Sequence, residues 1–230
     1  MKPSLSNVVR WSGLAALAAG IIFMVIQPIH PPDALSSVTT RGWVVIQSLK
    51  LAMCLLFIVG VTGLYLRQSG RMGWLGLAGF VAFAAAWALQ VPYVFVNAYI
   101  LPLLAAPAPA FVESYLGIVS GVPATMGLGA LPTIYLVVGV LYLLGGLLFG
   151  IAVFRARVLP RWSGALLALG SVLPLGLTSF VGHPLDRYFA VPVGLALAWM
   201  GYALWSERSS AATEAVPDLL GPQVGRLGTE

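Results

Sequence analysis

Lys50 is the residue whose position most suggests a binding role, because it interrupts a long apolar run. A charge at the centre of a membrane-spanning helix costs roughly 2.5–3.5 kcal/mol on insertion scales, so it usually faces protein or a cavity. Trp43, Gln47, Lys50 and Cys54 recur at helical spacing and would share one face. We expect this face to turn inward, where Lys50 meets an anionic ligand group or a carboxylate. The alternative is that its long stem bends back to the membrane surface.

Three carboxylates, Asp33, Glu113 and Asp186, are the candidate catalytic acids. Burial above an apolar cavity raises the pKa of a carboxyl group, which suits it to protonate a substrate. The alternative is that all three are solvated loop residues. Arg187 would be a second anion anchor, and the outer half of the third apolar run adds two polar side chains. The candidate ligand-binding residues are therefore Lys50, Gln47, Tyr93, Asn97 and Arg187.

The sequence His-Pro-x-Asp occurs twice, from His30 to Asp33 and from His183 to Asp186. Imidazole and carboxylate groups can bind a metal, which makes His30 and His183 weak candidate ligands. Proline also ends a helix and aspartate caps the next element, so the motif is equally good loop chemistry. The spacing fits no standard zinc pattern, and the lone Cys54 excludes paired-thiol chemistry. We expect neither a metal nor another cofactor.

These residues lie among six apolar runs in a chain that is 60% hydrophobic and 8% charged. Soluble domains carry roughly 25% charged residues, whereas a helix that crosses a bilayer needs about 20 apolar ones. The pattern predicts an all-α, polytopic transmembrane bundle within residues 1–206, followed by a disordered tail at 207–230. Pro107 and Pro109 are expected to prevent a regular helix in 103–120, where a re-entrant or interfacial element is the alternative. The predicted spans are 11–29, 43–66, 73–100, 131–154, 162–182 and 188–205.

The positive charges predict the orientation of this bundle. With six spans and a cytoplasmic N-terminus, nine of the twelve Lys and Arg residues fall inside, and only Arg41 and Arg187 fall outside. Lys50 is the remaining one. This asymmetry obeys the positive-inside rule and places both termini in the cytoplasm, with the protein in the inner (cytoplasmic) membrane of the cell. The net charge of +5 is thus a topology signal and does not indicate nucleic-acid binding.

An internal repeat groups the spans into pairs. Arg-Trp-Ser-Gly begins both the run at Arg10 and the run at Arg161, and Gly73-Trp74-Leu75-Gly76 is a partial third copy. Gln27 and Gln90 each lie 16 residues after the corresponding Trp. Tryptophan anchors helices at the membrane surface, and glycine allows close helix contact. We expect three tandem helical hairpins; chance similarity within a restricted membrane alphabet is the alternative.

No phosphate-binding loop, metalloprotease motif or nucleophile elbow is present in the sequence. Our leading hypothesis is a small multi-pass membrane protein that binds or passes a small, largely apolar ligand, or that assists a membrane complex. The alternative is a membrane-embedded enzyme acting on a lipid or isoprenoid, for example an acid-initiated cyclase. The expected partners are the lipid bilayer, the apolar ligand and a homo- or hetero-oligomeric assembly.

Overall fold

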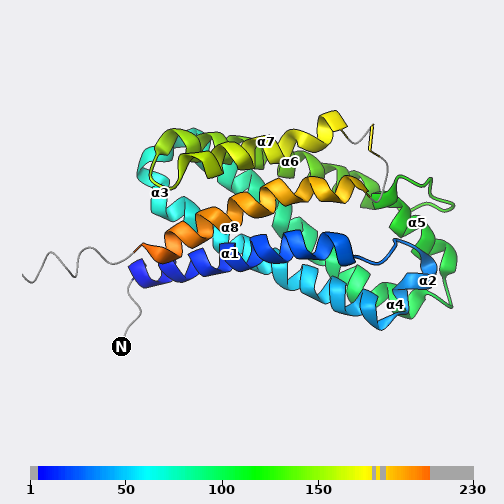
Figure 1. Ribbon diagram of the computed structural model, residues 1–230. Coiled ribbons are helices and arrows are strands. Elements are labelled where there is room, and N and C mark those ends of the chain that lie inside the picture. The colour runs from blue at the N-terminus through cyan, green and yellow to red at the C-terminus, as the bar shows by residue number, and fades with distance from the viewer. Residues whose placement is uncertain (1–4, 178–179, 182–184, 208–230) are drawn as a thin grey trace, which may run out of the picture.

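The computed structural model describes residues 5–177, 180–181 and 185–207, and within these ranges it is entirely helical apart from loops (Figure 1). Long helices lie side by side, and short ones gather at one end. The elements are α1 (Leu5–Ile29), α2 (Leu35–Val38), α3 (Arg41–Phe95), the π-helical turn η1 (Val96–Ile100), α4 (Leu101–Leu104), α5 (Pro109–Ser120), α6 (Leu131–Ala156), α7 (Arg161–Leu177), the 3₁₀ turn η2 (Leu185–Phe189) and α8 (Ala190–Ser206).

Four helical segments of the described chain are long and apolar enough to cross a membrane: 7–29, 41–104, 131–156 and 185–206. The predicted spans 43–66 and 73–100 both fall within the second of these. Of the predicted span 162–182, α7 covers the part up to Leu177, and the rest of the span lies partly outside the described residues. Pro174 removes a backbone hydrogen bond from the last turns of α7, which weakens the helix there. The predicted tail at 207–230 lies almost wholly outside the described residues.

Gly73 divides α3 into two arms. Its backbone has φ +56° and ψ −160°, a left-handed conformation that glycine adopts without a steric penalty. The helix otherwise continues through 67–72, which the apolar pattern had suggested as a loop. Gly60 on the first arm packs against Ala16 of α1, whereas Gly79 on the second arm packs against Phe149 of α6. The chain therefore turns back at Gly73, and Figure 1 shows α3 reversing its direction.

Residues 103–120 are more regular than expected, because α5 is a 12-residue helix. Pro109 occupies its first turn, where a missing N–H costs no intrahelical hydrogen bond. Gly121 then ends the helix in a left-handed conformation, with φ +73°. The expectation that the prolines exclude a regular helix was therefore wrong. Figure 1 places α5 beside α2 and α4 at one end of the bundle.

Close glycine contacts organise the long helices into two groups. Gly13 and Gly20 of α1 face Gly201 and Gly194 of α8, so the backbones of these helices touch. Together with the first arm of α3, they form one group. The second arm of α3 packs on α6, which in turn meets α7 where Gly164 lies against the α6 backbone. Tight packing of α1 on α8 brings the two ends of the described chain together, a contact that the repeat did not predict.

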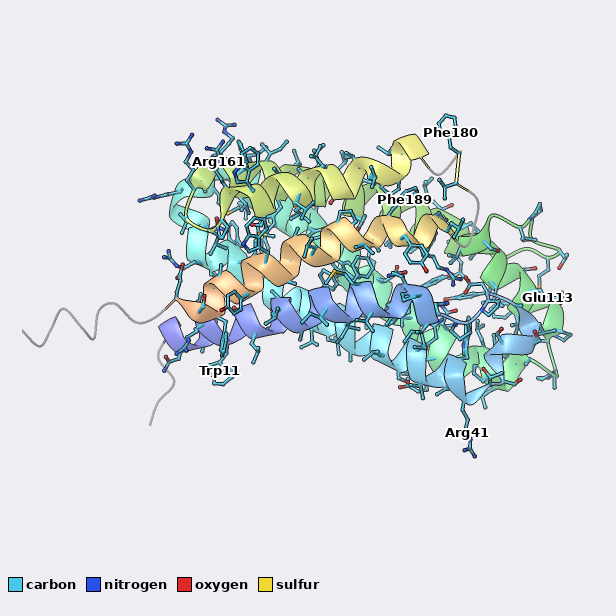
Figure 2. The ribbon with its side chains drawn as sticks, viewed as in Figure 1. Trp11, Arg41, Glu113, Arg161, Phe180 and Phe189 are labelled. Atoms are coloured by element: carbon cyan, nitrogen blue, oxygen red, sulfur yellow. The ribbon has the colours of Figure 1, made fainter. Side chains whose placement is uncertain are left out.

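The two full copies of Arg-Trp-Ser-Gly have similar surroundings. Trp11 and Trp162 are 64% and 62% exposed, while Gly13 and Gly164 both lie at close helix contacts. Figure 2 shows Trp11 and Arg161 at one end of the bundle and Arg41 and Glu113 at the other. The bundle thus has two chemically distinct ends.

Candidate functional site

A central cavity of about 320 Å³ lies between the long helices. Phe23, Met53, Trp87, Tyr142 and Phe189 supply much of its apolar wall. Each comes from a different helix or helix arm, so the whole bundle shapes this space. The polar side chains that reach it are Gln27, Lys50, Gln90, Tyr135, Asp186 and Arg187.

Packed aromatic rings form one side of the cavity wall. The rings of Phe57 and Trp87 are parallel, with centroids 3.9 Å apart, and Phe23 meets both of them edge-on at 5.5 Å. Such ring pairs contribute about 0.5–1.5 kcal/mol each beyond the burial of their area. The indole Nε1 of Trp87 is buried and has no hydrogen-bond partner. This side of the cavity is therefore apolar, and the unsatisfied Nε1 donor lies buried behind it.

Lys50 lies inside the bundle, on the helix face predicted from its spacing. Trp43, Gln47 and Cys54 on the same face are fully buried, whereas Lys50 is half-buried and lines the cavity. Its Nζ lies 3.3 Å from Nε2 of His30. The other ring nitrogen of His30, Nδ1, is 2.7 Å from the carbonyl oxygen of Pro31.

His30 is neutral at physiological pH. Burial, followed by the positive charges of Lys50 and Arg187, lowers its pKa from 6.5 to about 4. A neutral imidazole can accept a hydrogen bond from the Lys50 ammonium group, but it cannot balance the charge. Among the described residues, the hydrogen-bond partner of Lys50 is therefore a neutral side chain.

Arg187 joins two loops at the polar side of the cavity. One of its terminal nitrogens, Nη2, forms an ion pair with the Asp33 carboxylate, and Nη1 donates to the His30 carbonyl oxygen at 3.4 Å. The two charged side chains are only 13% and 9% exposed, so solvent screens the pair weakly. This contact connects η2 to the segment between α1 and α2. Asp186, the neighbour of Arg187, lines the same cavity.

Three of the predicted ligand-binding residues lie outside this cavity. Gln47 is buried, and its Oε1 has no hydrogen-bond partner. The side-chain Nδ2 of Asn97 donates to the Tyr93 backbone carbonyl. The backbone carbonyl of Asn97 accepts a 2.7 Å hydrogen bond from Nε1 of Trp43. The ring of Tyr93 stacks on Tyr115 at 4.9 Å. These side chains hold α3, η1 and α5 together beside the cavity.

Glu113 is separated from Asp186 by the architecture. It is exposed on α5 and, with Asp33, lines a different hollow of about 280 Å³ between the α1–α2 segment and α5. Of the three candidate acids, only Asp186 lines the central cavity. The structure therefore does not bring the three carboxylates to one site.

The weak metal hypothesis gains no support. In the described ranges, no group of three or more His, Cys, Asp and Glu residues is arranged to hold a metal ion. His30 is engaged by Lys50 and by a backbone oxygen, and His183 lies outside the described residues. Cys54 is a buried free thiol.

The sequence hypotheses missed most of the aromatic lining. Tyr135 and Tyr142 are seven residues apart, a spacing that places both on one face of α6, but this spacing is common in any apolar helix. Gln27 and Gln90 carried a better signal, since each follows a repeat Trp by 16 residues. Both line the cavity. No protein-family model, curated protein or solved structure matches this chain.

Proposed function

We propose that this protein crosses the membrane six times and binds a small, largely apolar ligand with one acidic group in its central cavity. In this arrangement the two arms of α3 are separate crossings joined at Gly73, and α7 is a short crossing. We also propose that the six crossings form three tandem hairpins within a membrane domain of residues 1–206, with both termini in the cytoplasm. The arginine-rich end carrying Arg161 then faces the cytoplasm, and the end carrying Glu113 faces outward.

The observation that carries the ligand assignment is the surroundings of Lys50. Its ammonium group lies against a neutral imidazole, while the nearby Arg187 is paired with Asp33. A charge partly removed from water is costly when no opposite charge is in contact with it, and no carboxylate of the described residues contacts the Lys50 ammonium group. A ligand carboxylate beside Lys50 would provide that offset and form a charge-assisted hydrogen bond.

The apolar part of the ligand has a matching surface. Phe23, Trp87 and Tyr142 offer aromatic faces, and small-molecule sites typically combine such walls with a few polar groups that fix orientation. The Lys50 ammonium group and these aromatic faces together favour a monocarboxylate with a compact hydrophobic body over a polar metabolite.

Quenching of tryptophan fluorescence tests this proposal in the purified full chain. The probes are para-bromobenzoate and para-bromobenzyl alcohol, which have similar shapes but differ in charge. We expect saturable quenching by the benzoate and at least about tenfold weaker binding of the alcohol. Trp87→Phe should remove the saturable component, because Trp87 lines the cavity. Equal, non-saturating quenching by both probes would overturn the assignment.

Asp186 supports the enzyme alternative to a limited extent, since it is the one candidate acid that lines the cavity. In that alternative the cavity accepts a lipid or isoprenoid chain, and Asp186 protonates it. Asp186→Asn should then abolish turnover while retaining the bound substrate, whereas Glu113→Gln should leave turnover unchanged. Conversion that survives in Asp186→Asn would exclude this role.

A further inference from the structure

A second hollow, at the opposite end of the bundle from Glu113, is lined by three arginines. It has a volume of about 430 Å³. It lies between the turn that joins the two arms of α3 and the C-terminal end of α6. We call it the arginine hollow; its lining is Arg67, Gln68, Gly70, Arg71, Arg157 and Val158.

Positive charge dominates the arginine hollow. Arg67 and Arg71 are four residues apart, so they lie on one side of the first arm of α3. Nε of Arg67 donates to the Glu207 carboxylate at 2.7 Å. No ion pair joins Arg71 or Arg157 to a carboxylate of the described residues. Within the described part of the chain, two exposed guanidinium groups beside this hollow therefore have no carboxylate partner.

Arg157 has an unusual backbone for its residue type. It ends α6 with φ +53° and ψ +31°, the one described residue other than glycine with a positive φ. Helices commonly end in this left-handed conformation with glycine, which lacks the Cβ that makes the conformation costly. Strain of this kind, when it persists, points to a role for the side chain. Here the side chain lines the arginine hollow.

Two tryptophans locate the arginine hollow relative to a membrane. Trp74, three residues after Arg71, is 85% exposed, and Trp162, five residues after Arg157, is 62% exposed. Exposed tryptophan at the end of an apolar helix is typical of the level of the lipid headgroups. The arginine hollow would therefore lie where headgroup phosphates are concentrated.

We propose that the arginine hollow binds a phosphate group, held by Arg71 and Arg157 with Arg67 at its edge. Guanidinium groups donate paired hydrogen bonds that match phosphate oxygens, and their charge is retained at any physiological pH. Basic pockets between membrane helices on the cytoplasmic side recognise lipid headgroups in this way. The phosphate can belong to an anionic phospholipid or be free in solution. The site is independent of the central cavity.

The test uses the full chain in a neutral detergent, with thermal unfolding as the readout. The probes are dihexanoyl phosphatidylglycerol, the matching dihexanoylglycerol without phosphate, and inorganic phosphate. We expect the phospholipid to raise the melting temperature and dihexanoylglycerol to have no such effect. If inorganic phosphate displaces the phospholipid at equal concentration, the site takes free phosphate. If it does not, the ligand is the lipid headgroup.

Three variants distinguish specific binding in the arginine hollow from nonspecific attraction of an anionic lipid to the positively charged end of the bundle. Arg71→Gln and Arg157→Gly should each weaken phospholipid binding by about tenfold. Arg157→Gly also relieves the backbone strain, so a loss of binding cannot be attributed to unfolding. Arg155→Gln is the matched control, because Arg155 is exposed at the same helix end but does not line the hollow. Equal weakening by Arg155→Gln and Arg157→Gly would overturn the proposal, as would stabilisation by dihexanoylglycerol.

Discussion

Nζ of Lys50 lies 3.3 Å from Nε2 of His30, so one of the two cations that line the central cavity is in contact with a neutral ring. The contact joins the first arm of α3 to the residue that follows α1. In the function that we propose, the positive charge of Lys50 is thereby available to a ligand, and the protonation state of His30 affects this contact. A protonated imidazole here would be repelled by the positive charges of Lys50 and Arg187.

Stability should therefore depend on pH through His30. In the unfolded chain an imidazole binds a proton below about pH 6.5, whereas the folded protein resists protonation until about pH 4. The contribution of His30 to stability is thus complete above pH 6.5 and decreases as the pH falls toward 4. The two pKa values set the full loss at about 3 kcal/mol.

Thermal unfolding between pH 7 and pH 4 measures this effect. His30→Gln keeps an acceptor for Lys50 but cannot titrate, so its melting temperature should fall less than that of the natural protein over the same range. Parallel curves for the two proteins would show that His30 does not contribute to acid sensitivity.

The ion pair between Arg187 and Asp33 should be energetically coupled, because both side chains are largely buried. In a double-mutant cycle, Asp33→Asn and Arg187→Gln should each destabilise the fold. The double variant should lose about 1–2 kcal/mol less free energy of unfolding than the sum of the losses in the two single variants. Unfolding in mixed micelles with a denaturing detergent measures the cycle. Strict additivity would mean that the pair does not hold η2 to the α1–α2 segment.

The contact between α1 and α8 should tolerate no added methyl group. A Cβ at Gly194 would lie 2.8 Å from the carbonyl oxygen of Gly20 and 2.6 Å from Cγ of Met24. We expect Gly194→Ala to lower the free energy of unfolding by about 1–3 kcal/mol through overpacking. Gly42→Ala is the control, since its Cβ would meet only Oγ1 of Thr40, at 4.0 Å. It should leave stability unchanged or raise it by up to about 1 kcal/mol. Equal effects of the two substitutions would contradict the packing described.

The orientation can be tested by labelling in intact cells. In a Cys54→Ser background, Arg41→Cys should react with an impermeant maleimide added outside, because Arg41 projects from the end that we propose faces outward (Figure 2). Arg155→Cys should react only after the membrane is permeabilised. The reverse pattern would invert the topology, and labelling of both from outside would exclude six crossings.

Apolar run length was enough to predict the helical class and most helix positions, because burial of long apolar segments in lipid leaves few alternatives. The turn at Gly73 was located less well. The predicted spans left residues 67–72 between two helices, but the helix continues through them until Gly73 permits a reversal. The helix α5 was missed because the prolines were read as breakers, although the first turn accepts proline.

The candidate site was predicted only in part. A charge in an apolar helix is conspicuous, so Lys50 could be singled out, and Arg187 was found as a second cation on the same side. Trp87 and Tyr142 could not be identified from the sequence, because aromatic residues in an apolar helix give the same sequence pattern whether they line a cavity or face lipid. Gln47 lies on the same helix face as Lys50, but it is nearer the N-terminal end of α3 and does not line the cavity. Only the packing of the helices separates these cases.

The most direct test compares the two bromobenzene probes in the natural protein and in Lys50→Met. Methionine keeps an unbranched apolar stem, shorter by one heavy atom, and removes the charge. Para-bromobenzoate should bind the Lys50→Met variant about tenfold or more weakly, while the affinity for para-bromobenzyl alcohol stays the same or increases. If the two proteins bind the benzoate equally well, Lys50 does not recognise an acidic group, and the proposed ligand class is wrong.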